Sequence, residues 1–350
     1  MVGVAMSIMI DEINEQPQAI ACAVDREYRN VAGLVAELKS RSIRHVVIAA
    51  RGTSDNAAVY AKYLIEIVAG IPVALAAPSV FTLYEASVYV QDSLVIGISQ
   101  SGQAPDVVQT LQAARSAGAI TACITNVVGS PIEAVSDFTF LCHAGEERSV
   151  AATKTYTTSL AIVALIAGLW ACDESLLDSL RSLPTHIEAT LKLGDAIEAA
   201  SERYRYIQEC AVLARGINQC TALEAALKMT ETSYLVAKPY SGADFLHGPI
   251  AMVSDGFPCF LFAPDGKTYP SMLELAQKLQ TRNAEMVIVA RNPEILALSV
   301  KPIAIPCEVT EYLSPLVYIV PGQLWAFHLA KNRGHDPDKP RGLSKVTLTR

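Results

Sequence analysis

Short apolar runs alternate with helical patterns along most of this chain. The clearest run is 45–50, HVVIAA, in which every residue after the first is apolar. Such runs are typical of parallel strands that are covered on both faces. This one leads into the turn RGTS at 51–54 and a helical pattern at 57–69. Further strands of this kind are expected at 72–76, 93–98, 120–125 and 138–142. The alternation predicts an α/β fold with an open, doubly wound parallel sheet.

The strand pattern begins again in the second half of the chain. Residues 212–216, VLARG, resemble the IAARG of 48–52, and later strands are expected at 258–263, 286–290 and 302–305. The chain therefore looks internally duplicated. We expect a division into a helical arm at 1–44, a first domain at 45–172, a helical connector at 173–204, a second domain at 205–332 and a polar, mobile tail at 333–350.

Composition narrows the classes of protein to which the chain can belong. Its 350 residues suit two domains, and 28 basic against 35 acidic residues, without a basic run, argue against nucleic acid as a partner. The apolar run 160–170 is about half the length of a membrane-spanning helix and is expected to be a buried helix. Eight cysteines without a CxxC pair favour buried, reduced thiols and offer no zinc-type spacing. The start lacks the basic region of a signal peptide, so we expect a cytoplasmic protein with no membrane segment and no metal.

One helical pattern, at 221–234, carries charge on a single face. Glu224, Lys228 and Glu231 fall at i, i+4 and i+7 and share that face. Two carboxylates beside one ammonium are either a solvated face with helical ion pairs or an acid–base centre. The opposite, mostly apolar stripe is expected to pack on a sheet; it consists of Leu223, Ala226, Leu227, Thr230 and Tyr234.

An irregular segment marked by Pro, Ser and Gly is expected after this helix, ending in HGP at 247–249. Gly248 and Pro249 keep His247 on a loop. By itself, a single loop histidine is more often a surface residue than a catalytic one.

Two hydroxyl-rich turns make the strongest physical case for a ligand. In a doubly wound sheet the carboxyl ends of the strands face one crevice, and helix N-termini with free N–H groups suit a phosphate monoester. The alternative is simple helix capping by serine and threonine. No P-loop is present and no GxGxxG follows any strand, which disfavours nucleotide and nicotinamide cofactors. The turns contribute Thr53 and Ser54 after one strand and Ser99, Gln100 and Ser101 after another.

Seven segments, taken in order, resemble one protein family. They are DEINEQPQAI at 11–20, RGTS at 51–54, SQSG at 99–102, VAATK at 150–154, ALEAALKMTETSY at 222–234, HGP at 247–249 and DPDKPRGLSK at 336–345. The chain resembles sugar-phosphate isomerase (SIS) domain proteins over nearly its whole length. It is most similar to the isomerase half of glucosamine-6-phosphate synthase and to the related sugar-6-phosphate deaminases. The resemblance implies two flavodoxin-like SIS subdomains, each with a five-stranded parallel sheet between helices, and a homodimer.

The resemblance also implies roles for individual residues. Glu231 matches the base that moves the proton, His247 the ring-opening residue that enters the partner's active site, and Lys345 the tail lysine that can form a Schiff base. Glu224 and Lys228 match the supporting charged pair. No cofactor is implied, and the tail is expected to fold over the site as a lid. The remaining matches are phosphate ligands, Ser54, Ser99, Gln100 and Ser101, and positions near the sugar, Thr53, Val150 and Ser344.

Some features depart from the synthase pattern. Ala104 stands where that pattern has threonine and Ala152 where it has serine, so one phosphate hydroxyl and one sugar contact are missing. The synthase also has an N-terminal glutaminase domain with a cysteine nucleophile. Here the sequence opens on the helical arm, and its first cysteine is Cys22. We therefore expect that this chain does not make ammonia from glutamine by itself.

The leading expectation is an isomerase and deaminase that converts glucosamine 6-phosphate to fructose 6-phosphate and ammonia. One alternative is an isomerase or deglycase for another phosphorylated amino sugar, such as fructosamine 6-phosphate or galactosamine 6-phosphate. A third is a module that only senses a sugar phosphate. The presence of Glu231, His247 and Lys345 together argues against a sensor, because a binding protein needs no base, ring opener or reactive amine.

Overall fold

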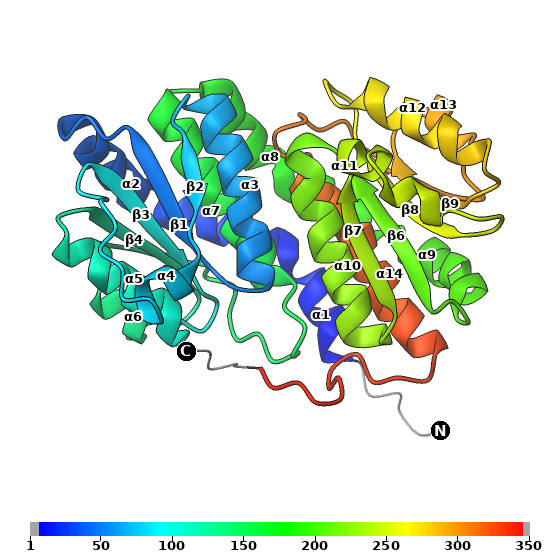
Figure 1. Cartoon of the computed structure of the whole chain (residues 1–350), viewed down its shortest axis with the longest axis horizontal. Helices are drawn as coiled ribbons and strands as arrows, with labels where there is room; N and C mark the ends of the chain where they lie inside the picture. Colours follow the sequence, from blue (N-terminus) through cyan, green and yellow to red (C-terminus); the bar gives the residue numbers. More distant parts are fainter. Residues whose placement is uncertain (1–6, 346–350) are drawn as a thin grey trace. The chain divides into compact units, whose positions relative to one another are not determined.

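The computed structural model describes residues 7–345, which form two compact units, each built around one parallel sheet (Figure 1). The sheet-A unit consists of Glu15–Glu147, Lys154–Arg181 and the tail from Ser344. The sheet-B unit consists of the chain up to Asn14, Arg148–Thr153 and Ser182–Leu343. Both units therefore combine segments that are far apart in sequence. The five-part division expected from the sequence remains a prediction.

Sheet A has the strand order β2-β1-β3-β4-β5, and all of its strands are parallel. Every residue of β3 and β4 is buried, as expected of central strands with helices on both faces. The strands are β1 His45–Ala49, β2 Val73–Leu75, β3 Ser93–Ile98, β4 Ile120–Thr125 and β5 Phe138–Leu141. Helices α2 Gln16–Ser40, α3 Thr53–Val68 and α7 Lys154–Ala171 cover one face, and α4 Pro78–Thr82, α5 Pro105–Ser116 and α6 Pro131–Ala134 lie on the other.

Helix α7 forms much of the core of the sheet-A unit. Within residues 7–345 it is the one helix long and apolar enough to cross a bilayer by length and composition, and 83% of it lies buried inside the protein. Apolar residues all around a helix are typical of one buried in a core. The buried helix expected at 160–170 is confirmed, and it is longer than the apolar run itself.

Sheet B has the order β10-β9-β8-β6-β7 and is also parallel throughout. Its strands are β6 Glu209–Ala214, β7 Val236–Ser241, β8 Pro258–Ala263, β9 Glu285–Ala290 and β10 Lys301–Ala304. Helices α10 Gln219–Ser233 and α14 Ser314–Asn332 cover one face, and α11 Gly242–Leu246, α12 Tyr269–Gln280 and α13 Pro293–Leu296 lie on the other. Helices α1 Ile8–Asn14 and α9 Gly194–Ser201 pack on α14, and α8 Glu174–Leu191 precedes α9 in the chain.

The two sheets share one topology. If the strands of each sheet are numbered from its own first strand, both orders become 2-1-3-4-5, which is the flavodoxin-like order. The α/β class and the two five-stranded parallel sheets between helices are therefore confirmed. The common order also agrees with the duplication that the repeated strand ends indicate.

The structure differs from the sequence analysis after α10. The Pro, Ser and Gly residues predict an irregular segment there, but the structure has strand β7 and the short helix α11. Strand β7 contains Pro239, which has no N–H group to donate to a neighbouring strand. This is possible because β7 is an edge strand, paired with β6 on one side.

The expectation of buried thiols is wrong for Cys172. This residue is exposed because it lies just beyond the end of α7, in a turn where its φ is 56°. Cys22 and Cys307 are half-buried. The five buried cysteines are Cys123, Cys142, Cys210, Cys220 and Cys259.

Candidate active site

Helix α10 carries the charged residues that are expected to perform the chemistry, and it buries the face that bears them. Glu224 and Lys228 are buried. In the opposite stripe Ala226 is buried, Leu223, Leu227 and Tyr234 are half-buried and Thr230 is exposed. The charged face is therefore covered more completely than the apolar stripe, and the alternative of a solvated charged face is wrong.

Close packing of α10 on α14 explains this burial. A Cβ added to Gly322 of α14 would lie 3.0 Å from the Cβ of Ala225, and the hydroxyl of Thr232 donates to the carbonyl of Ala326 at 3.2 Å. Small residues at a helix crossing let the two backbones approach closely, and ridges then fill grooves. The face of α10 beside Ala225 is therefore buried, including its charged residues.

Lys228 lies between the two carboxylates. Its Nζ is 2.7 Å from Oε2 of Glu231 and 3.4 Å from Oε1 of Glu224. Burial lowers the pKa of Lys228, but the two carboxylates outweigh burial and raise the pKa above its usual value. The lysine is therefore a fixed positive charge in contact with both acids, which compensates for its removal from water.

Glu231 is the member of this group that remains accessible. Its side chain is 24% exposed, whereas those of Glu224 and Lys228 are almost completely covered. Its Oε2 lies in ion-pair contact with Lys228, but no described residue donates an aligned hydrogen bond to that oxygen. An accessible carboxylate oriented by a fixed ammonium is an arrangement that suits a general base.

His247 follows α11 and is exposed. Its backbone N–H donates to the Asp244 carbonyl at 3.1 Å, and Gly248 after it has a φ of 138°, a conformation that favours glycine. Within the described part of the chain, its imidazole takes part in no hydrogen bond or ion pair with Glu231 or any other residue. Its backbone is thus fixed at the end of α11, while its side chain is exposed.

The two hydroxyl-rich turns lie side by side at the carboxyl edge of sheet A. Strands β1 and β3, which lead into them, are neighbours in the sheet. Arg51, in the turn after β1, donates from Nε to the buried Asp106 of α5 at 2.7 Å. This ion pair ties the turn that precedes α3 to the start of α5, so Ser54 and the SQSG turn belong to one edge.

The SQSG turn requires its glycine. Gly102 has a φ of 65°, and a Cβ at this position would collide with the side chain of Ser130. The hydroxyl of Ser99 accepts the N–H of Gly102 at 3.1 Å, and the hydroxyl of Ser101 accepts the N–H of Gln103 at 3.3 Å. These contacts hold the turn in a tight bend.

Neither helix after these turns is capped by a side chain, because the N-cap residues are Gly52 for α3 and Ala104 for α5. Simple capping therefore does not explain the hydroxyl groups. The SQSG turn does not open α5 directly, because the helix begins only at Pro105. The backbone N–H at the first position of a helix has no partner within the helix. Proline, which lacks this N–H, is therefore suited to position 105.

Lys345 contacts a carboxylate that the sequence analysis missed. Its Nζ lies 2.9 Å from Oε2 of Glu147, whose side chain is fully buried. Glu147 also accepts the N–H of Thr155 at 3.1 Å and its hydroxyl at 2.7 Å, in the first turn of α7. A helix N-terminus favours negative charge. The sequence signal that could have identified Glu147 is its place as an acidic residue a few positions before the VAATK segment.

Several contacts hold the tail residues Asp338 and Arg341 in this structure, and the mobility expected of residues 333–350 stays a prediction. The carboxylate of Asp338 accepts three hydrogen bonds at the start of α1, and Arg341 packs on Tyr234 with its guanidinium carbon 4.2 Å from the ring centroid. The backbone N–H of Arg341 also donates to the Tyr234 hydroxyl at 2.8 Å. The donors to Asp338 are the hydroxyl of Ser7 at 2.7 Å, the N–H of Ile8 at 2.9 Å and the N–H of Met9 at 2.7 Å.

The predicted site residues divide between the two units. The structure brings together the three charged residues of α10 in one unit and the two serine-bearing turns in the other. Among residues 7–345, no group of three His, Cys, Asp or Glu side chains is arranged to hold a metal. The sheet-B unit holds Val150, Glu224, Lys228, Glu231 and His247, and the sheet-A unit holds Thr53, Ser54, Ser99, Gln100, Ser101, Ser344 and Lys345.

Comparison with protein families gives a match to the SIS domain over residues 39–168 and 208–330. The chain belongs to the SIS domain family. The first matched SIS segment contains all five strands of sheet A, and the second contains all five strands of sheet B. The two sheets described above are therefore two SIS domains.

Named SIS relatives are enzymes of sugar phosphates. The chain is 38% identical over 344 residues to the glutamine–fructose-6-phosphate aminotransferase (isomerizing) of Pyrococcus horikoshii; the match covers 96% of this chain and 57% of that protein. The chain thus spans less than two thirds of the length of this relative.

Two solved structures have the same fold over nearly the whole chain. One, from Silicibacter pomeroyi DSS-3, is provisionally described as a phosphosugar isomerase; it is 33% identical, with a TM-score of 0.85, over 95% of this chain and 100% of that one. The other is the C-terminal domain of glucosamine-fructose-6-phosphate aminotransferase from Francisella tularensis. It is 27% identical, with a TM-score of 0.85, over 97% of this chain and 100% of that one.

Proposed function

We propose that this SIS protein is an amino-sugar 6-phosphate isomerase and deaminase, which converts glucosamine 6-phosphate and water to fructose 6-phosphate and ammonia. The broader activity, isomerisation of a sugar phosphate, is supported by the names of the relatives from Pyrococcus horikoshii and Silicibacter pomeroyi. The observation that carries the proposal is the group of Glu224, Lys228 and Glu231 on α10. Moving a proton between two carbons requires a positioned base of this kind.

The proposed reaction balances with the side chains available. His247 assists ring opening, which gives an aldehyde at C1 with an amine at C2. Glu231 removes the proton from C2 and returns it to C1, while the amine nitrogen loses one proton and the C1 oxygen gains one, so that an imine remains at C2. Water adds to the imine and ammonia leaves, which gives the ketone of fructose 6-phosphate. The positive charge of Lys228 stabilises the ionised base, and the N–H groups and hydroxyls of the serine turns hold the phosphate.

Lys345 is the proposed Schiff-base residue. Its amine would attack the carbonyl of the open-chain sugar, and a C=N bond forms as water leaves. Water later hydrolyses that bond, which restores the carbonyl and the free lysine. Glu147 then has a positioning role, because it holds the Lys345 ammonium beside the start of α7. We infer that Glu147 and Lys345 act as a pair, with the lysine leaving the carboxylate when it reacts.

A second substrate is favoured by one specific observation. Ala104 and Ala152 replace the threonine and serine of the synthase pattern, which removes two hydroxyl groups. The hydroxyl missing at Ala104 is a phosphate contact, which all three substrates share, whereas the one missing at Ala152 is a sugar contact. A hydroxyl that meets a sugar oxygen discriminates strongly between sugars, since its loss leaves a polar group unpaired. Another phosphorylated amino sugar, such as galactosamine 6-phosphate or fructosamine 6-phosphate, is therefore the alternative substrate.

Ammonia release from these three amino sugar phosphates tests the proposed reaction. We expect the fastest release from glucosamine 6-phosphate, and Glu231→Gln should slow it by about 10²–10⁴-fold, the usual contribution of a general base. Sugar-phosphate affinity should change little, because the amide keeps the shape of the side chain. Glu274→Gln, an exposed position on α12, is the matched control.

Two outcomes of that assay would oppose the proposal. Binding of all three compounds without any turnover would favour a sugar-phosphate sensor. Turnover by Glu231→Gln within tenfold of the unchanged protein would remove Glu231 from the role of base. Faster release from one of the other two sugars would keep the chemistry but replace the substrate.

A shared site in a homodimer is the second part of the proposal, with His247 entering the partner's active site. Its support is the exposed imidazole, which finds no partner among residues 7–345. If sites are shared, a mixed dimer of Glu231→Gln and His247→Ala chains has one site with both changes and one with neither. Random exchange of the two inactive proteins should then restore roughly a quarter of the wild-type activity. No recovery, once native mass spectrometry has shown that the chains exchange, would place each site within one chain.

A further inference from the structure

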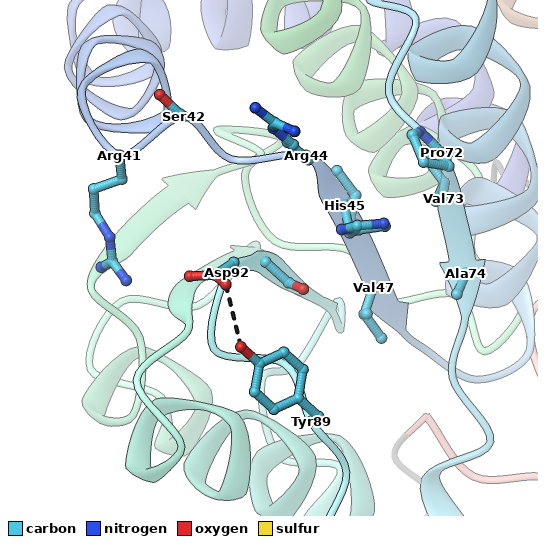
Figure 2. Close-up of a pocket in the computed structure, with 12 residues that line it drawn as sticks. Arg41, Ser42, Arg44, His45, Val47, Pro72, Val73, Ala74, Tyr89 and Asp92 are labelled. Atoms are coloured by element: carbon cyan, nitrogen blue, oxygen red, sulfur yellow. Dashed lines mark hydrogen bonds between the residues drawn. The ribbon is translucent and has the colours of Figure 1, made fainter.

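A second hollow lies in the sheet-A unit, at the amino ends of strands β1, β2 and β3 (Figure 2). Its volume is about 730 Å³, which is within the range of roughly 300–1,000 Å³ found for small-molecule sites. The serine turns follow the carboxyl ends of β1 and β3, so this hollow is at the other edge of the same sheet. The proposed reaction uses none of its residues.

The wall of the hollow is apolar along the strands. Val47 of β1, Pro72 before β2 and Ala74 of β2 line it. His45 and Val47 alternate with the buried Val46, so they lie on one face of β1. Figure 2 shows the two side chains on this strand, with the ring of Tyr89 approaching from the segment before β3. An apolar wall with a few polar groups around it is typical of a ligand site.

Positive charge predominates among the side chains that surround this wall. Arg41, Arg44 and His45 line the hollow together with a single acid, Asp92. Within residues 7–345, the side chains of Arg44 and His45 form no hydrogen bond or ion pair, whereas Arg41 donates to the Gly118 carbonyl at 2.7 Å. The whole chain has a net charge of -7, so a local excess of arginine over acid, with the Arg44 guanidinium and the His45 imidazole both without protein partners, favours an anionic ligand.

Tyr89 presents an open aromatic face to the hollow. It is 79% exposed, and its hydroxyl donates to Asp92 at 3.2 Å (Figure 2). The charge of Asp92 raises the pKa of Tyr89, so the phenol keeps the proton with which it donates. A flat ring can stack on an exposed tyrosine face. In Figure 2 the guanidinium of Arg44 points away from this ring, so the cation and the aromatic face lie apart.

We propose that this hollow binds a small organic anion that carries a flat ring. The ring lies on Tyr89 and the apolar wall, and the anionic group extends toward His45 and Arg44. The separation of the aromatic face from the Arg44 guanidinium selects a ligand with its charge at one end and its ring at the other. The proposal stands independently of the reaction assigned to Glu231 and Lys345.

The probe for this test is 2-naphthalenesulfonate, measured by isothermal titration calorimetry. It has a flat ring and one negative group but is neither a sugar nor a phosphate, so it does not resemble a ligand of the serine turns. We expect affinity of about 1 mM, for which the binding free energy is about -4 kcal/mol. Sulfate, which has no ring, and 2-naphthol, which has no charge, should each bind at least about fivefold more weakly, since ring and charge each contribute.

Two pairs of variants test whether the probe binds in this hollow and not elsewhere on the protein. Tyr89→Leu and the double variant Arg44→Gln, His45→Gln should each weaken binding of the probe by at least about fivefold. Tyr84→Leu is the matched aromatic control, because Tyr84 lies in the same segment and is 78% exposed but does not line the hollow. Arg29→Gln, at an exposed position on α2, is the matched charge control. Both controls should stay within twofold of the unchanged protein.

Three results would overturn the proposal: no binding of the probe up to about 20 mM, equal loss in the control variants, or equal affinity for sulfate and the probe. The altered residues are exposed, so an unchanged urea-unfolding midpoint should confirm that each variant is folded. A variant with a lowered midpoint is replaced by Tyr89→Ser or by Arg44→Gln alone, for which the same reduction is expected.

Discussion

Replacing Glu147 with glutamine should release Lys345 while keeping the local structure. The amide oxygen of glutamine can still accept the hydrogen bond that the Thr155 N–H donates to Oε1, and the Thr155 hydroxyl, which donates to Oε2, can turn to accept a hydrogen bond from the amide NH2 group. What the change removes is the negative charge 2.9 Å from the lysine Nζ. The variant therefore tests whether this ion pair holds the lysine in place.

The expected magnitude follows from the burial of the two partners. A hydrogen bond between charged groups contributes about 1.5–3 kcal/mol when both are shielded from water. Glu147 is fully buried, but the Lys345 side chain is 23% exposed, so screening reduces this to about 1–2 kcal/mol. Because 1.4 kcal/mol is tenfold in an equilibrium constant, the ratio of released to held lysine should rise about 5- to 30-fold.

Trypsin measures this ratio directly. It cleaves after lysine only when the side chain enters its own binding pocket, and a lysine paired with Glu147 cannot do so. When opening is fast relative to cleavage, the cleavage rate follows the population of the released form. Loss of the last five residues, followed by intact mass spectrometry, should therefore be about 5- to 30-fold faster in Glu147→Gln, by the population ratio estimated above.

The neighbouring Glu146→Gln is the matched control, because Glu146 is exposed in the same segment. It should change the cleavage rate by less than twofold. Equal rates in Glu147→Gln and the unchanged protein, with equal urea-unfolding midpoints, would refute the idea that this ion pair holds the tail lysine.

Two further predictions concern stability. Gly102→Ala should lower the free energy of unfolding by about 2–4 kcal/mol, because alanine is strained at a φ of 65° and its Cβ would displace the buried Ser130. Gly33→Ala in α2, where a Cβ meets nothing within 4 Å, should not lower that free energy. Equal urea midpoints for the two variants would contradict this prediction. Glu285 has its pKa lowered chiefly by the Arg203 hydrogen bond, so its contribution to stability is present above the unfolded pKa of about 4.3 and is lost as the pH falls through the folded value. The difference in urea midpoint between the unchanged protein and Glu285→Gln should therefore shrink from pH 7 to pH 3, and a constant difference would be inconsistent with a role for this charge.

The local pattern of apolar and polar residues predicts much of the fold, because it determines which segments form strands and helices. Strands β3, β4 and β8 have the limits expected from their apolar runs, since a strand buried on both faces contains few polar residues. Strand β7 was not predicted from the sequence, because it contains Pro239 and its residues are half-buried or exposed. Edge strands lack the continuous apolar signal of central strands.

Burial of the charged face of α10 could not be predicted from the helix alone. Helical periodicity indicates which residues share a face, but another element decides which face is covered. Here that element is α14, whose Gly322 lies close to Ala225 although almost 100 positions separate them in the sequence. Glu147 was missed for the same reason, since its partner Lys345 is 198 positions away.

Three motifs that are far apart in sequence meet in the sheet-B unit. The tail residue Asp338 caps the start of α1, where a carboxylate is favoured by the exposed N–H groups and the helix dipole. From within α1, the carboxylate of Glu12 accepts the N–H groups of Arg148 and Ser149, and the N–H of Val150 donates to the Asp338 carbonyl at 3.4 Å. The N-terminal motif, the VAATK segment and the tail therefore hold one another in place.

This arrangement decides how the role of the tail can be tested. A chain cut after Arg333 would lose Lys345, but it would also lose the cap that Asp338 provides to α1. Removing a capping side chain costs about 0.5–2 kcal/mol, and the segment around Val150 would lose its support as well. Loss of activity in the truncated chain would thus have two causes that cannot be separated. Glu147→Gln avoids this ambiguity, because it releases the lysine and leaves every contact of Asp338 intact.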